Sequence, residues 1–231
     1  GTTDTQVLEL TIGTKGTDDR RERLMIKSHE TPQSWKSAAH TFQIMQEIGG
    51  KCFQDDPHFR LPRPLAQDET KLVLIEEGIR GKSLYDRLLR ANAENARLYI
   101  QMAAQWLAKL HNCRLQIEPP GEFMGKEFER LSHYVSILYR INHKHTQRIQ
   151  EIMDRVVEME RALYPGHSER LVQGHGDYHP RNIFIGQDNP DDKETLFVAA
   201  VDFQSSYTMP PAFDVGTFVA QFRNQFYHFR E

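Results

Sequence analysis

The chain has 231 residues, of which 39% are hydrophobic and 26% are charged, and its formal net charge at pH 7 is −3. This is the composition of a globular protein of one or two domains, and the small negative charge excludes the basic surface that nucleic-acid binding requires. No apolar run reaches the roughly 18 residues of a membrane span, and we find no secretory signal. We therefore expect a cytoplasmic protein that binds neither nucleic acid nor membrane, with Cys52 and Cys113 as free thiols.

Short strands and an amphipathic helix are predicted in the first third of the chain. Residues 7–12 alternate between polar and apolar side chains like a strand, and residues 24–27 are predicted as the strand that returns after a polar turn. An amphipathic helix is predicted at 35–48, ended by the two glycines that follow it. The apolar run 72–77 predicts a short buried strand.

The next part of the chain is predicted to be mainly helical. Helices are predicted at 84–90, with Ser83 as the N-cap, and at 95–110. A helical pattern also runs through 128–163, where the polar segment 142–145 indicates two helices or a bend.

Polar residues gather around a predicted β-hairpin in the last third of the chain. Its strands are residues 183–185 and 196–201, with Asp177 and Asn182 before the first strand and Asp202 after the second. These three side chains can therefore meet at one end of the hairpin. Phosphoryl transfer uses such a set, because a carboxylate can orient the attacking hydroxyl while hard oxygen ligands hold Mg²⁺. We predict Asp177 as the base, and Asn182 and Asp202 as the magnesium ligands.

Two other interpretations of this stretch remain open. His175, Asp177 and His179 alternate along the chain, which is also the pattern of a metal site for hydrolysis. Such a site normally has further ligands, and no second His-rich cluster follows in the sequence. The other interpretation is that Asp177 and Asn182 only cap turns, which is the common role of Asp and Asn.

The same stretch carries a family resemblance. Residues 175–182 read His-Gly-Asp-x-His-Pro-x-Asn, and a hydrophobic strand pair and another Asp follow. This pattern resembles the catalytic and metal-binding segments of the aminoglycoside phosphotransferase/choline kinase-like family of small-molecule kinases. Residues 211–216 resemble that family's Pro-x-x-Asp-Leu-Ala segment. The resemblance implies an α+β, two-lobed protein-kinase-like fold, with a small β-rich N-terminal lobe at 1–77 and a larger helical C-terminal lobe at 78–231.

The resemblance also implies functions for residues outside this stretch. Lys27 matches the strand lysine that neutralises nucleotide phosphates, although a lysine at a strand end is ordinarily a solvated edge residue. The segment Glu77, Gly78 and Ile79 matches the linker whose backbone hydrogen-bonds the adenine. The family places the acidic partner of the lysine early in the following helix, whereas the acid of the predicted helix is Glu47, near its C-terminal end.

Further positions complete the comparison with the family. His111 and Asp214 are expected to be structural. Asp214 is expected to cap the helix that follows it and to support the predicted catalytic loop, residues 174–182. The Gly-rich hairpin that covers the phosphates should precede Val7, where only Gly1, Thr2 and Thr3 match its position, so we expect it to be cut short or missing in this sequence. Family members continue past the last predicted helix, so we also expect C-terminal helices of the acceptor site to be missing from the sequence.

The expected activity is ATP-dependent transfer of the γ-phosphate to a hydroxyl of a small molecule, with Mg²⁺ as the metal. ATP or GTP is the expected donor, and the acceptor is expected to be aminoglycoside-, choline-, sugar- or amino-acid-like. The alternative is a non-catalytic, kinase-like module that binds a nucleotide or another ligand. It is favoured by the truncated Gly-rich hairpin and by the missing acid at the expected place in the helix.

Overall fold

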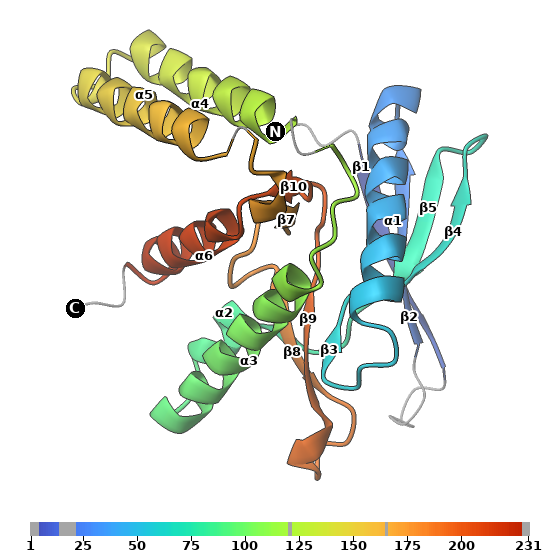
Figure 1. The fold of residues 1–231 in the computed structure, drawn as a ribbon. Helices are drawn as coiled ribbons and strands as arrows, with labels where there is room; N and C mark the ends of the chain where they lie inside the picture. Colours follow the sequence, from blue (N-terminus) through green and yellow to red (C-terminus); the bar gives the residue numbers. More distant parts are fainter. Residues whose placement is uncertain (1–4, 14–21, 120–121, 165, 228–231) are drawn as a thin grey trace.

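The computed structural model describes residues 5–13, 22–119, 122–164 and 166–227. A sheet with one long helix, built by the N-terminal residues, lies beside a mainly helical part built by the rest of the chain (Figure 1). The predicted combination of an N-terminal sheet with a helical C-terminal part is therefore confirmed. The Gly-rich hairpin expected before Val7 falls largely outside the described residues.

The N-terminal sheet has the strand order β1-β2-β5-β4, and neighbouring strands are antiparallel. The strands are β1 (Thr5–Ile12), β2 (Glu22–His29), β4 (Pro64–Asp68) and β5 (Val73–Glu77). The three strands predicted in this region are confirmed, with bounds that differ by a few residues. Strand β2 lies between β1 and β5, so Lys27 stands in the interior of the sheet.

Helix α1 (Pro32–Cys52) packs on one face of this sheet (Figure 1). Thr31 caps its start by accepting a hydrogen bond from the Ser34 amide at 3.1 Å. Trp35 and Phe42 are buried against Leu74 of β5, which fixes the helix on the sheet.

The predicted end of this helix was wrong. Helix α1 continues through Gly49 and Gly50 and ends at Cys52. Each glycine in a helix interior costs about 1 kcal/mol relative to alanine. Ile48 is fully buried and Cys52 nearly so, and burial of apolar side chains in the last turns outweighs that cost.

Short strands within and around residues 171–203 form two further sheets. The strands of the larger one, in the order β3-β9-β8-β6, are β3 (Phe59–Arg60), β9 (Leu196–Ala200), β8 (Ile183–Gln187) and β6 (Lys82–Ser83). The smaller sheet pairs β7 (Val172–Gln173) with β10 (Thr208–Met209). The predicted β8–β9 hairpin is confirmed. Strand β3 pairs in parallel with β9, so the chain before residue 77 contributes a strand to the sheet of the catalytic region.

The helical part contains α2 (Leu84–Leu88), α3 (Ala93–Asn112), α4 (Glu122–Arg140), α5 (Thr146–Leu163) and α6 (Pro211–Gln225). Helices α4 and α5 pack side by side, which confirms the predicted interruption at 142–145 (Figure 1). Ser83 caps α2 as predicted, accepting a hydrogen bond from the Asp86 amide at 3.1 Å. Within the described ranges, every helix lacks the length or the apolar composition that a membrane crossing requires.

Trp106 of α3 occupies the centre of the main core. Its side chain is fully buried, and its ring stacks on Phe53 and on Tyr178 with centroid distances of 4.9 and 5.5 Å. The indole Nε1–H donates to the Arg60 carbonyl oxygen at 2.8 Å. One side chain therefore joins the segment after α1, the strand β3 and the catalytic loop into a single core.

The prediction of two free thiols was wrong. Cys52, the last residue of α1, forms a disulfide with Cys113, which directly follows α3. The sequence could not indicate this pairing, because the two cysteines are 61 residues apart and only the packing of α1 against α3 brings them together. The pairing also removes free thiols as a reason to expect a reducing compartment.

Candidate active site

The β8–β9 hairpin brings the two predicted magnesium ligands to one end of its sheet. Asn182 directly precedes β8, and the Val201 amide after β9 donates to the Asn182 carbonyl oxygen at 2.9 Å. Asp202 is the next residue, and its side chain is exposed. Its backbone is left-handed, with φ of 66°, a conformation that is uncommon outside glycine and is concentrated at functional sites.

Asp177 is hydrogen-bonded to Asn182. The Asn182 amide nitrogen donates to Asp177 Oδ2 at 3.2 Å and to the Asp177 carbonyl oxygen at 3.1 Å. These two bonds fix the orientation of the amide, so Asn182 Oδ1 is left without a partner. Within the described residues, the Asp202 carboxylate also lacks a hydrogen bond or ion pair. These uncommitted oxygens are the hard ligands that Mg²⁺ prefers, and the donor set fits that ion.

His179 stabilises the ionised form of Asp177. His179 Nε2 lies 3.4 Å from Asp177 Oδ2. Its hydrogen bond lowers the pKa of Asp177 below the ordinary aspartate value, while partial burial opposes this effect. Asp177 is therefore an ionised carboxylate at neutral pH and can accept a hydrogen bond from a hydroxyl. From the sequence, His179 had been considered only as a ligand of a hydrolytic metal site.

Asp214 fixes the backbone of the catalytic loop. Its fully buried carboxylate accepts hydrogen bonds from the His175 amide at 2.9 Å and from the Gly176 amide at 2.8 Å. His111 Nε2 donates to the same carboxylate at 2.9 Å. These contacts agree with the supporting functions expected of Asp214 and His111. The expectation that Asp214 caps the following helix was wrong, because α6 begins at Pro211 and Asp214 lies in its first turn.

His175 is buried beneath the catalytic loop and uses both ring nitrogens. Nε2 donates to the Val201 carbonyl oxygen at 3.0 Å, and Nδ1 accepts from the Asp177 amide at 3.3 Å. Burial lowers the pKa of His175, and the nearby carboxylates, Asp214 first, only partly offset this effect. The ring is therefore neutral and structural, which removes one ligand from the hydrolytic metal site considered above. Across the described ranges, no cluster of three or more His, Cys, Asp or Glu side chains is arranged to hold a metal ion.

Gly176 allows the segment after Asp202 to lie directly on the catalytic loop. Its φ is +81°, a left-handed conformation that favours glycine. A Cβ atom at this position would stand only 1.8 Å from the Ser205 carbonyl oxygen. The close approach of these two backbones therefore requires glycine.

Lys27 pairs with an acid that the sequence analysis did not identify. Lys27 Nζ lies 2.6 Å from Glu76 Oε1, on the neighbouring strand β5. Glu47, the helix acid considered from the sequence, pairs instead with Lys51 of its own helix. A charged residue within an apolar strand is the sequence signal that could have pointed to Glu76. In the structure, Glu76 is indeed buried. Within the described residues, Lys27 makes no hydrogen bond or ion pair with the three polar residues of the hairpin end.

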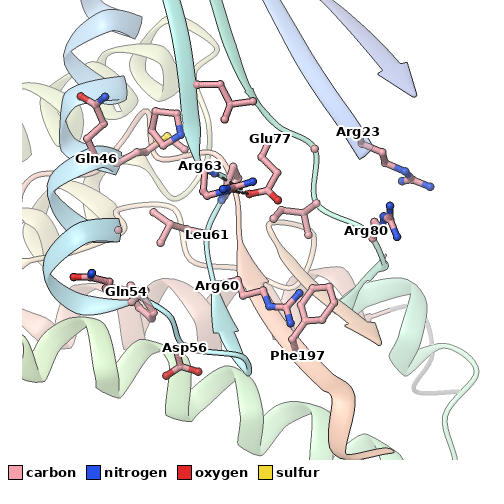
Figure 2. Close-up of a pocket in the computed structure, with 18 of the residues that line it drawn as sticks. Arg23, Gln46, Gln54, Asp56, Arg60, Leu61, Arg63, Glu77, Arg80 and Phe197 are labelled. Atoms are coloured by element: carbon pink, nitrogen blue, oxygen red, sulfur yellow. Dashed lines mark hydrogen bonds and ion pairs between the residues drawn. The ribbon is translucent and has the colours of Figure 1, made fainter. Parts of the chain in front are cut away.

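The segment of Glu77, Gly78 and Ile79 connects β5 to the helical part. The Glu77 amide donates to the Arg63 carbonyl oxygen at 2.9 Å, and the Gly78 amide donates to the Arg23 carbonyl oxygen at 2.7 Å. No acceptor for the Ile79 amide is found among the described residues, so this N–H is available to a ligand. The Glu77 carboxylate forms an ion pair with Arg63 at 3.0 Å (Figure 2).

A cavity of about 770 Å³ borders this connecting segment (Figure 2). Its other walls include the start of β2, the C-terminal end of α1, the chain between α1 and β4, and the β8–β9 hairpin. Arg60 lies over the Phe197 ring at 4.0 Å and pairs with Asp188 of the hairpin. The four side chains predicted to act on the phosphates and the acceptor do not line this cavity. The cavity is therefore separate from Asp177 and Asp202 and shares only the connecting segment with the predicted site.

Comparison with known families decides the class of this protein. A sequence profile of the phosphotransferase enzyme family matches residues 14–228. The chain belongs to this family. Membership confirms the predicted family and the predicted class of enzyme, a small-molecule phosphotransferase. No curated protein sequence matches this phosphotransferase.

Solved structures of phosphotransferases share the fold of this family member. Aminoglycoside phosphotransferase APH(3'')-Id from Streptomyces rimosus ATCC10970 is 17% identical with a TM-score of 0.58, over 94% of this chain and 78% of that chain. The streptomycin–ATP complex of APH(2'')-IIa is 16% identical with a TM-score of 0.54, over 90% and 69%. Macrolide 2'-phosphotransferase MphH from Brachybacterium faecium is 13% identical with a TM-score of 0.53, over 93% and 70%. At these identities the likeness shows the fold alone, and it confirms the predicted two-lobed, kinase-like α+β fold.

Proposed function

We propose that this phosphotransferase moves the γ-phosphate of ATP or GTP to a hydroxyl of a small molecule, with Mg²⁺ as the metal. The observation that carries the proposal is the hydrogen-bonded pair of Asp177 and Asn182 beside the exposed Asp202. Phosphoryl transfer asks little covalent chemistry of a protein, so positioning and charge neutralisation supply most of the rate.

Asp177 is the proposed catalytic base. Its carboxylate accepts a hydrogen bond from the acceptor hydroxyl and directs that oxygen at the γ-phosphorus. The hydroxyl proton passes to Asp177 as the new oxygen–phosphorus bond forms and the bond to the nucleoside diphosphate breaks. Because His179 lowers the pKa of Asp177, the group is a weak base, and orientation of the acceptor is its larger contribution.

Asn182 Oδ1 and the Asp202 carboxylate are the proposed magnesium ligands. Held by these residues, Mg²⁺ would neutralise the negative charge of the nucleotide phosphates. The ion keeps several waters and takes few protein ligands, so one amide and one carboxylate are sufficient. The exposed position of Asp202 leaves space for the phosphates and waters that complete the coordination.

The nucleotide is proposed to lie between the lobe of residues 1–77 and the lobe of residues 78–231. Lys27 would neutralise the phosphates, while the backbone of Glu77 and Ile79 would hydrogen-bond the adenine. The uncommitted amide of Ile79 supports this placement. One structural relative was solved with ATP and another with GDP, so both nucleotides are proposed as donors.

The proposed acceptor is a hydroxyl-bearing small molecule of the aminoglycoside kind. This choice is supported by relatives that were solved with streptomycin, gentamicin and kanamycin. The macrolide phosphotransferases among the relatives make macrolides the next acceptors to test. Choline-like, sugar-like and amino-acid-like alcohols follow, since fold alone does not select the acceptor.

Thermal melting with ATP alone, Mg²⁺ alone and both together tests the proposal. We expect the melting temperature to rise with both ligands and to stay nearly unchanged with Mg²⁺ alone, because the ion is held jointly by protein and phosphates. Asp202→Ala should abolish the Mg²⁺-dependent part of the shift. Asp191→Ala, an exposed acid in the turn of the hairpin, is the control and should retain it.

The same experiment separates the alternatives. Absence of a shift with ATP, GTP or their magnesium complexes would contradict the proposal and favour a module that binds another ligand. A shift with Zn²⁺ alone would favour the hydrolytic metal site. After a positive result, aminoglycosides are screened for acceptor-dependent release of ADP.

A further inference from the structure

The acid that pairs with Lys27 comes from the sheet. On the antiparallel strands β2 and β5, Lys27 stands opposite Leu74, and Glu76 stands opposite Met25. Lys27 and Glu76 are therefore diagonal neighbours on one face, within reach of long side chains. Their charged atoms are 2.6 Å apart, and the side chains are only 23% and 12% exposed. No other lysine–carboxylate pair in the described residues is so little exposed on both sides.

Helix α1 offers no acid to Lys27. Its one acidic residue, Glu47, is half exposed and pairs with Lys51 one turn further along the helix. The face of α1 that packs on the sheet is apolar. His40, nearer the middle of the helix, pairs with Glu118 at 2.7 Å. The acid of α1 and its His40 are thus both paired with residues other than Lys27.

We propose that Glu76 is the residue that positions Lys27 for the nucleotide phosphates, an inference that rests on the function proposed above for Lys27. The ammonium group has three donors, so one can bind Glu76 while the others face phosphate oxygens. A lysine side chain otherwise samples many rotamers, and fixing it beforehand reduces the entropy lost when the nucleotide binds. Glu76 acts through Lys27 and does not itself contact the nucleotide.

The acid that holds Lys27 does not come from α1. Both partners of the ion pair belong to neighbouring strands of one sheet. Helix α1 is meanwhile fixed to α3 by the disulfide between Cys52 and Cys113. The sheet therefore supplies both members of the ion pair.

Calorimetric titration of the whole protein with Mg·ATP and with adenosine tests the role of Glu76. Glu76→Gln keeps the shape of the side chain and removes its charge. We expect it to weaken Mg·ATP binding by about tenfold, since the pair is only partly screened by solvent. Adenosine has no phosphates, so its affinity should stay unchanged. Glu76→Asp should recover part of the Mg·ATP affinity, and the control Glu47→Gln should keep all of it.

A double-variant measurement completes the test. In a Lys27→Met background, Glu76→Gln should cause no further loss of Mg·ATP affinity, because its effect passes through Lys27. A further tenfold loss in that background would overturn the proposal. Equal losses for adenosine and Mg·ATP, or no loss for either, would also overturn it.

Failure of the proposed function looks different from failure of this inference. If the unmodified protein bound adenosine but gained nothing from the phosphates and Mg²⁺, the function proposed for Lys27 would itself be wrong. Tight, Asp202-dependent binding of Mg·ATP together with an inert Glu76→Gln variant would reject only the role of Glu76.

Discussion

The catalytic loop and the N-terminal sheet hold their functional side chains by different means. Asp214 bonds the loop backbone directly, and both ring nitrogens of His175 join the loop to the strand end before Asp202. Lys27, in contrast, is held by one side-chain ion pair with Glu76. Backbone hydrogen bonds to buried groups persist at high salt, whereas a partly exposed ion pair is screened. The residues proposed to act on the acceptor and on Mg²⁺ are therefore positioned through the backbone, whereas Lys27 depends on a single side-chain contact.

The largest expected effect comes from the catalytic loop. Asp177→Ala removes the group that orients and deprotonates the acceptor, so turnover should fall by about 10³- to 10⁴-fold. Mg·ATP affinity should change little, because the proposed nucleotide contacts lie on Lys27, Asn182 and Asp202. Turnover and nucleotide affinity are measured on the same preparation. A large loss of Mg·ATP binding in this variant would show that Asp177 belongs to the phosphate side, and the contrast between the two regions would disappear.

The second effect concerns the support of the loop. Asp214→Asn replaces an acceptor of three hydrogen bonds with an amide that can accept fewer, inside a fully buried site. We expect the free energy of unfolding to fall by about 3–5 kcal/mol, which lowers the melting temperature by roughly 10 °C. Circular dichroism during heating measures this change. The exposed Glu194→Gln is the control, and a melting temperature equal to that of the control would contradict the support assigned to Asp214.

The smallest effect concerns the junction between the two regions. Reduction of the Cys52–Cys113 disulfide should lower the free energy of unfolding by about 2–4 kcal/mol, because the closed segment is long. Melting with and without dithiothreitol measures this difference. The double variant Cys52→Ser/Cys113→Ser should melt at one temperature under both conditions. If the unmodified protein behaved like the double variant, the disulfide would contribute no stability.

The sequence predicted those parts of the fold that local pattern determines. The hairpin around Asn182 and Asp202, the strand bearing Lys27 and the capped helix after Ser83 follow from periodicity and turn chemistry. The spacing of the catalytic stretch was enough to predict the family, because it joins several residue types at fixed intervals. Asp214 and His111 could be assigned to support because they resemble supporting residues of the family and because a lone histidine at a helix end is more often structural.

The features that the sequence did not predict all depend on contacts between distant segments. Glu76 looked like the end of an apolar strand, and only the register of β5 against β2 places it beside Lys27. Helix α1 passes two glycines because tertiary burial of its last turns exceeds the local cost. The disulfide requires the packing of α1 on α3, and neither helix sequence carries that information.

The contact at Gly176 limits how this enzyme can change. The Ser205 carbonyl oxygen occupies the space of any side chain at 176, so the obstacle is backbone against backbone, and no neighbouring rotamer can relieve it. In a mutational library of the catalytic loop, substitutions of Gly176 should therefore fail because of backbone geometry, whatever their effect on catalysis. Substitutions that change the acceptor are therefore expected elsewhere around the site and not at Gly176.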